Sequence, residues 1–270
     1  MIPNLLDCND LGSLRMLLRR LTAFFFLPTV TMMAPAAHAA TIKVLTGGAF
    51  KQVVMAIVPG FEARTGHKVE VQNDTAGALQ KRIAGGEAFD VAVITPPVLQ
   101  ALAAQGHVRA EGIVPLAKVA IGVAVKSGTP SPQIATVEQF KQAVLNARKV
   151  AYIDPAAGGS SGIYLDGLFT RMGIAEQVRA KAVLVPGGLV ADRLVKGEAD
   201  LAIHQISEIL PVAGVTLVGP LPDAIQNYTT YAGAVGSRAA SRDAAQAFIA
   251  ALSGAEAAEV LRGKGMLPAR

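Results

Sequence analysis

Short apolar runs alternate with segments of helical periodicity along most of the chain. Strands are predicted at 42–46, 67–72, 89–94, 117–126, 149–153, 182–185, 200–205, 215–219 and 228–235. Helices are predicted at 49–64, 76–84, 97–105, 137–147, 161–172, 189–196 and 241–254, most of them ending at or near a glycine. Regular alternation of strand and helix predicts an α/β fold. The two long apolar runs, 117–126 and 228–235, are candidates for strands that cross between two lobes.

Two segments echo each other. Residues 77–94 and 188–204 both run from glycine through a helix carrying Leu and Arg to a G-E-A turn, an aspartate and an apolar strand. This repetition favours two similar lobes over a chance similarity of two helix–strand units, and it predicts helices of about three turns on the surface of a sheet. Arg82 and Arg193 occupy matching places, either on solvated faces or in position to pair with a carboxylate.

The first 39 residues have the features of a secretion signal. Three arginines between residues 15 and 20 precede an apolar run at 21–33, and Ala37-His38-Ala39 fits the A-x-A cleavage rule. We expect cleavage after Ala39 and export to the periplasm; an N-terminal anchor helix is the alternative. Met16 is a second candidate for the start of the chain.

Removal of that segment changes the chemistry available to the mature protein. The single cysteine, Cys8, is lost, which excludes a thiol nucleophile, a disulfide and a cysteine zinc site. The remaining 22 basic and 18 acidic residues give a formal charge of +4, a mild excess that slightly favours an anionic ligand. Aromatic residues are 5% of the chain and Trp is absent, so a stacking platform for nucleic acid is not expected.

Small residues gather ahead of predicted helices at four places: 47–48, 76–77, 158–162 and 187–188. A helix N-terminus at the carboxyl end of a strand offers unpaired N–H groups and a partial positive charge. Any one cluster is most simply a turn, but the set of four predicts an anion cradle. The hydroxyls of Thr46, Thr75, Ser160 and Ser161 would add donors.

Catalytic and cofactor motifs are weak. There is no Walker loop, dinucleotide fingerprint, zinc-binding histidine pair or G-x-S-x-G elbow, so neither a cofactor nor a metal is expected. His204 stands at the end of an apolar strand, next to Gln205. It is either a structural histidine or a ligand donor and proton shuttle.

Four segments, in this order and spacing, resemble the periplasmic solute-binding proteins of the molybdate-binding-protein-like family. They are LTGGAFKQVV (45–54), TAGALQKRIAGGEAFDVAVI (75–94), DPAAGGSSGIYLDGLFTRMGI (154–174) and LVKGEADLAIHQISEI (194–209). The resemblance covers about 41–270. It implies a type II periplasmic binding protein fold, in which two α/β lobes, each with a central mixed β-sheet flanked by helices, are joined by two crossing strands. The first lobe would hold 40–121 and 229–270, and the second 122–228.

The family's oxyanion-binding pattern is largely missing. The serine positions of the molybdate binders read Ala49 and Ala76 here, and the tyrosine position after the second strand motif reads Gln205. Each lost hydrogen bond to a charged group costs about 1.5–3 kcal/mol, so we expect an organic di- or tricarboxylate rather than molybdate. The predicted ligand-binding residues are Thr46, Gly47, Gly48, Ala49, Phe50, Thr75, Ala76, Gly77, Thr95, Ser160, Ser161, Gly162, Gly188, His204 and Gln205.

The resemblance favours solute binding for transport, and it leaves two alternatives: an isomerase, and a sensory partner that binds ligand for a membrane receptor without a transporter. As a solute-binding protein, the chain would be a monomer that delivers a small anion to the membrane permease of an ABC-type importer, without nucleic acid or cofactor. An isomerase would use the same fold, because a relative in this group acts on aconitate. His204 with Glu208 or Asp154 would then supply the acid and base.

Overall fold

The structure, a computed structural model, describes residues 39–269. The predicted secretion signal, apart from Ala39, and Cys8 lie outside the described residues. The strands are β1 (Thr41–Gly47), β2 (Lys68–Asp74), β3 (Val91–Ile94), β4 (Val114–Lys126), β5 (Val150–Ile153), β6 (Ala182–Val185), β7 (Leu201–Gln205), β8 (Val215–Pro220), β9 (Tyr228–Val235) and β10 (Met266–Pro268). The α-helices are α1 (Gly48–Thr65), α2 (Ala76–Ala84), α3 (Pro96–Ala104), α4 (Val137–Asn146), α5 (Ser160–Arg171), α6 (Ala175–Arg179), α7 (Asp192–Val195), α8 (Ile206–Ile209), α9 (Arg242–Ser253) and α10 (Ala255–Gly263). Short 3₁₀ helices are η1 (Ala110–Gly112), η2 (Pro155–Ala157) and η3 (Asp223–Ile225).

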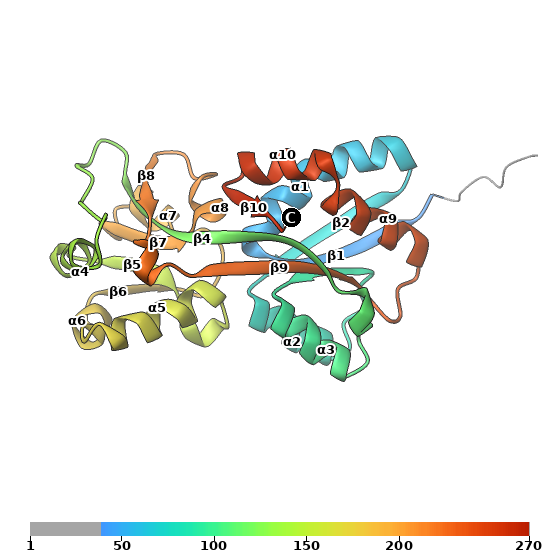
Figure 1. Cartoon of the computed structure of the whole chain (residues 1–270), viewed down its shortest axis with the longest axis horizontal. Helices are drawn as coiled ribbons and strands as arrows, with labels where there is room; N and C mark the ends of the chain where they lie inside the picture. The colour runs from blue at the N-terminus through green and yellow to red at the C-terminus, as the bar shows by residue number, and fades with distance from the viewer. Residues whose placement is uncertain (1–38, 270) are drawn as a thin grey trace, which may run out of the picture. The chain divides into compact units, whose positions relative to one another are not determined.

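The strands form one hydrogen-bonded sheet in the order β2-β1-β3-β9-β4-β7-β5-β6, with β8 and β10 also pairing with β4. The long strand β4 changes partners along its length. Its residues 114–120 pair with β9, and 121–126 pair with β7 and β8. In Figure 1, β4 and β9 run between two groups of elements. We call the group built on β1, β2, β3, β9 and β10 the first lobe and the group built on β5–β8 the second lobe. The lobe boundaries at 121/122 and 228/229 stay a prediction.

Helices cover both faces of each part of the sheet. In β1, Ile42 belongs to a buried cluster with α1, α9 and α10, whereas Leu45 belongs to the cluster with α2 and α3 on the opposite face. In the second lobe, Phe169 of α5 packs with α4 and β5, and Leu194 of α7 packs against the other face. Strands buried on both faces read as continuous apolar runs, which is why the sequence shows blocks rather than strict alternation.

The two echoed segments fold alike at the turn between helix and strand. Arg82 Nε lies 2.6 Å from a Glu87 carboxylate oxygen, and the Glu87 N–H donates to the Arg82 carbonyl. Arg193 and Glu198 repeat both contacts, with the ion pair at 2.7 Å. Both arginines thus pair with carboxylates of their own lobe. The second helix is shorter than predicted: α7 spans only the four residues Asp192–Val195, and Gly188, just before the predicted start, adopts φ +84°.

Other sequence predictions hold. The Thr136 hydroxyl accepts the Gln139 N–H while the Gln139 side chain accepts the Thr136 N–H, the capping box expected at the start of α4. The expected crossing strand at 117–126 is β4, which begins three residues earlier. The short elements α6, α8 and β10 were not predicted. Within residues 39–269, no single helix has the length and apolar composition to span a membrane. The helices α9 and α10 have that length and composition only when they are counted together, and a 58° bend separates them.

Candidate functional site

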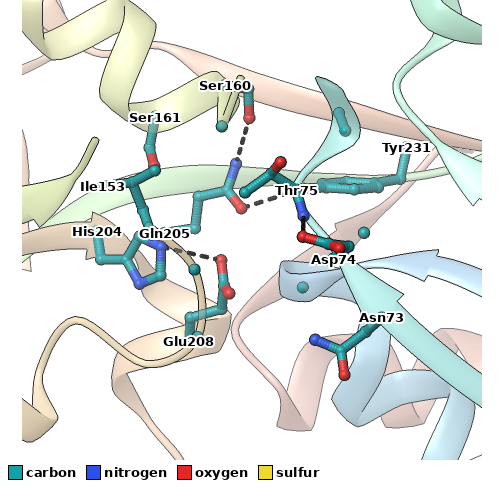
Figure 2. A pocket seen from close by; sticks show the side chains of 16 residues that line it. Asn73, Asp74, Thr75, Ile153, Ser160, Ser161, His204, Gln205, Glu208 and Tyr231 are labelled. Atoms are coloured by element: carbon teal, nitrogen blue, oxygen red, sulfur yellow. Dashed lines mark hydrogen bonds and ion pairs between the residues drawn. The ribbon is translucent and has the colours of Figure 1, made fainter. Parts of the chain in front are cut away.

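A pocket lies at the carboxyl ends of strands from both lobes (Figure 2). β1 and β2 contribute from the first lobe, and β5 and β7 from the second. This is where an open α/β sheet places its ligand, because strand ends and helix starts converge there. The lining residues are Gly47, Gly48, Asn73, Asp74, Thr75, Ala76, Ile153, Gly159, Ser160, Ser161, Gly187, Gly188, His204, Gln205, Glu208 and Tyr231.

Three helices begin at this pocket: α1 at Gly48, α2 at Ala76 and α5 at Ser160. α2 is capped by the Thr75 hydroxyl, which accepts the Ala78 N–H at 3.1 Å. No side chain caps α1 or α5, whose N-cap residues are both glycines. The first N–H groups of a helix have no partner within it, so these two starts offer donors and positive potential to an anion.

The lining of the pocket includes neither lysine nor arginine. Its ionisable side chains are Asp74, His204, Glu208 and Tyr231. The Asp74 carboxylate accepts the Thr75 N–H at 2.8 Å and lies 3.6 Å from Arg82, so its charge is balanced outside the pocket. Attraction for an anion therefore has to come from helix starts and neutral donors rather than from basic side chains.

A chain of hydrogen bonds crosses one wall of the pocket. The buried Tyr231 hydroxyl donates to the side-chain oxygen Oε1 of Gln205 at 3.1 Å, and the side-chain nitrogen Nε2 of Gln205 donates to Ser160 Oγ at 3.0 Å (Figure 2). Burial, and secondarily the nearby Glu208 carboxyl, raises the pKa of Tyr231, so its hydroxyl stays protonated. Gly47 provides the room for the Tyr231 ring, because a Cβ at Gly47 would lie 2.7 Å from a ring carbon.

The pocket also holds a buried pair of ionisable groups. His204 Nε2 lies 3.2 Å from Glu208 Oε2, and these side chains are 2% and 9% exposed. Burial lowers the pKa of His204 from 6.5 to about 3 and raises the pKa of Glu208 from 4.5 to about 8. Burial favours the neutral form of each group, so the pair carries no net charge at pH 7.

The two lobes touch at the rim of the pocket. The Thr75 hydroxyl donates to the Ala157 carbonyl, and the Gly77 N–H donates to the Gly158 carbonyl at 3.1 Å. Thr75 and Gly77 belong to the start of α2, Ala157 ends η2, and Gly158 follows it in the turn before α5. These contacts join the start of α2 in the first lobe to the turn that precedes α5 in the second lobe, beside the pocket.

The structure brings most of the predicted site residues together and places the rest nearby. The predicted residues that line the pocket are Gly47, Gly48, Thr75, Ala76, Ser160, Ser161, Gly188, His204, Gln205 and Glu208. Those outside the lining are Thr46, Ala49, Phe50, Gly77, Thr95, Gly162 and Asp154.

Most residues outside the lining have a local role. Ala49 and Phe50 are fully buried in the core of the first lobe. Thr95 is the N-cap residue of α3. Gly162 packs against the Ile153 backbone, where a Cβ would lie 2.2 Å from the carbonyl oxygen. Asp154 caps the 3₁₀ helix η2 by accepting the Ala156 N–H at 2.9 Å, so of the two predicted carboxyl partners only Glu208 meets His204.

The lining residues that were not on the predicted list are Asn73, Asp74, Ile153, Gly159, Gly187 and Tyr231. Of these, Gly159 and Gly187 fall in the small-residue clusters at 158–162 and 187–188. Asn73 and Asp74 end β2, and the rule that ligands lie beyond strand ends points to them. Tyr231 lies within β9, a crossing strand, where its approach to Gln205 depends on how the strands pair. Among residues 39–269, no group of three or more His, Cys, Asp or Glu side chains is arranged to hold a metal ion.

The fold and pocket define a class of protein: two α/β lobes joined by crossing strands that enclose an anion site built from helix starts. The chain belongs to the bacterial extracellular solute-binding protein family, which it matches over residues 42–267. It is 34% identical over 234 residues to an aconitate isomerase from a Pseudomonas species, covering 84% of this chain and 88% of that protein.

Solved structures share the fold at low sequence identity. The periplasmic molybdate-binding protein of Azotobacter vinelandii matches with a TM-score of 0.71 and 18% identity, covering 84% of this chain and 98% of that one. The sulfate-binding protein SubI of Mycobacterium tuberculosis matches with a TM-score of 0.69 and 18% identity, covering 85% of this chain and 87% of that one. Both likenesses confirm the type II periplasmic binding protein fold that the sequence predicts.

Proposed function

We propose that this chain is an exported, periplasmic enzyme that interconverts cis- and trans-aconitate by moving a proton between two carbon atoms of the ligand. The observation that carries the proposal is the Glu208 carboxyl, buried 3.2 Å from His204 in a pocket otherwise suited to anions. A carboxyl that ionises close to neutral pH opposes anion binding once it is charged, so a pocket built only to capture anions gains nothing from one. A carboxyl with a pKa near neutrality is suited to accept and return a proton.

The donors of the pocket favour an extended organic anion over a compact oxyanion. The uncapped starts of α1 and α5 belong to opposite lobes, so they are placed to hold carboxylates at two ends of one ligand. Asn73, Ser161 and Gln205 add neutral side chains between them. A tricarboxylate offers several acceptors to such a distributed set, whereas a tetrahedral oxyanion needs donors that converge on one point.

The reaction follows from the acidity of the aconitate methylene group, which stands beside one carboxylate and next to the double bond. The ionised Glu208 carboxylate takes a proton from this carbon. The C–H electron pair then delocalises over the three-carbon unit into the carboxylate at its far end. Glu208 returns the proton to that far carbon, the double bond moves, and the other isomer forms. Atoms and electrons balance, and Glu208 ends ionised as it began.

His204 and the helix starts support this cycle without exchanging protons themselves. Neutral His204 can donate its Nε2–H to the Glu208 carboxylate at the observed 3.2 Å, which stabilises the ionised form. Because burial lowers the pKa of His204 to about 3, the imidazole does not take the proton from Glu208. Negative charge that builds up on the ligand carboxylates faces the starts of α1 and α5, where preorganised N–H dipoles lower its energy.

The proposal is supported by the 34% identity to the Pseudomonas aconitate isomerase over 84% of this chain. The test is to incubate the purified protein separately with cis- and trans-aconitate and to follow both isomers by proton NMR. We expect each isomer to convert to the same equilibrium mixture. Binding measured by calorimetry without any conversion would overturn the enzymatic proposal.

A second candidate function is capture of an organic anion for a membrane permease of an ABC-type importer. The match of residues 42–267 to a solute-binding family favours it. The same calorimetry against a panel of di- and tricarboxylates, molybdate and sulfate tests it. Tight binding of one carboxylate, with no chemical change, is the result expected of a solute-binding protein.

A further inference from the structure

The Glu208 carboxyl lies against the first residue of α1. A Cβ placed on Gly48 would stand 2.5 Å from Glu208 Oε1 and 3.4 Å from Glu208 Cδ. Gly48 is not among the glycines with positive φ, so its backbone conformation is open to any residue. Space for the carboxyl, rather than backbone freedom, is therefore what glycine provides at this position.

Glu208 is held from two sides. Oε1 faces Gly48 of the first lobe, and Oε2 pairs with His204 of the second lobe at 3.2 Å. Its helix α8 packs against α1 and β4, and Ile206 of α8 joins the core of the first lobe. The helix that carries Glu208 is therefore anchored, and the only part of this residue that can yield to a new neighbour is its side chain.

Resting on the proposed function, we infer that Gly48 is a positioning residue for the proton transfer: the absence of a side chain at the start of α1 fixes where the Glu208 carboxyl sits. A methyl group at Gly48 meets the flexible end of Glu208, not backbone, so the fold should survive the substitution. The carboxyl then moves toward the middle of the pocket, away from His204 and toward water. It loses both its place beside the ligand carbon and the burial that keeps it neutral.

The experiment combines Gly48→Ala, Glu208→Asp and the double variant, with Gly167→Ala as control. Gly167 is a helical glycine of α5 whose added Cβ would meet only the mobile end of Arg171, at 3.3 Å. We expect Gly48→Ala to lower kcat at least about tenfold, as displacements of about 1 Å do. Because aspartate is shorter by one methylene, Glu208→Asp should cost much less kcat in the Gly48→Ala background than in wild type.

A second readout does not depend on activity. Carbon-13 NMR titration of the side-chain carboxyls measures the pH midpoint of Glu208, whose signal is assigned by its loss in Glu208→Gln. The midpoint reports whether this carboxyl is buried or exposed to water. In Gly48→Ala its midpoint should fall toward the ordinary glutamate value, while Gly167→Ala leaves it in place. An unchanged midpoint with additive effects on kcat would overturn the inference. If wild type converts neither isomer, the proposed reaction fails, and the titration alone decides whether Gly48 positions the carboxyl.

Discussion

The backbone of Gly77 in the first lobe lies directly against the backbone of Gly158 in the second. The Gly77 N–H donates to the Gly158 carbonyl at 3.1 Å, and a Cβ on Gly77 would stand 2.9 Å from the Gly158 Cα. Gly158 needs glycine for its φ of +74°, whereas Gly77 lacks a positive φ and needs glycine only for this close approach. The contact closes the rim of the ligand pocket.

The substitution Gly77→Ala should therefore weaken ligand binding without weakening the lobe that contains it. The methyl group obstructs closure of the two lobes, and we expect the Kd for trans-aconitate to rise by about tenfold or more, a cost of about 1.4 kcal/mol. Alanine is the better helix former by as much as about 1 kcal/mol, so the Tm without ligand should not fall. Calorimetry measures the Kd and thermal unfolding measures the Tm, with Gly167→Ala as the control for both. An unchanged Kd would contradict a role of the Gly77–Gly158 contact in ligand binding.

Stability should respond to pH through Glu208. Its pKa is raised from 4.5 to about 8 in the folded protein, so the unfolded chain releases this proton first as the pH rises. The stabilising contribution of Glu208 to the free energy of unfolding is fully present below about pH 4.5 and is lost progressively up to about pH 8. Glu208→Gln removes the dependence and should gain unfolding free energy over wild type between pH 5 and 8, by roughly a few kcal/mol at the upper end.

Urea unfolding of both proteins at several pH values measures that gain. The matched control is Glu70→Gln, an exposed carboxyl on β2. A difference between Glu208→Gln and wild type that stays constant from pH 5 to 8 would show that the Glu208 carboxyl is not held neutral by burial.

The rate of isomerisation should follow the ionised form of the same group. Because only the carboxylate can remove a proton from carbon, kcat/KM is expected to rise about tenfold per pH unit below about pH 8 and to level off above it. Initial rates from pH 6 to 9, with circular dichroism to confirm folding throughout, give this profile. A rate that is flat across the range would assign the base to another group.

Much of the fold could be predicted because its signals are local. The Thr136 and Gln139 capping box, the glycine that ends α1 at Gly66 and the apolar run of β4 each depend on residues close together in the chain. The convergence of helix starts at one pocket followed from two general rules, that helix N-termini attract anions and that ligands lie beyond strand ends.

The rest depended on packing between distant segments. Tyr231 reaches Gln205 only because β9 pairs with β4, and no pattern near residue 231 reports that pairing. α7 is shorter than the echo suggested, since residues 189–191 form a turn before the helix begins at Asp192, and no local pattern distinguishes that turn from a first helical turn. The sequence named Glu208 and Asp154 as alternative partners of His204 and did not show which of them meets it. The meeting of His204 and Glu208, and the packing of Glu208 against Gly48 of the first lobe, appear only in the folded chain.

The central claim is that the Glu208 carboxyl moves the proton, and Glu208→Gln tests it most directly. Glutamine has nearly the same shape but cannot accept a proton from carbon. We predict that kcat for interconversion of cis- and trans-aconitate falls at least about 100-fold, while calorimetry shows trans-aconitate binding at least as tight as in wild type. A variant that binds aconitate and turns it over within a few-fold of the wild-type rate would contradict the account.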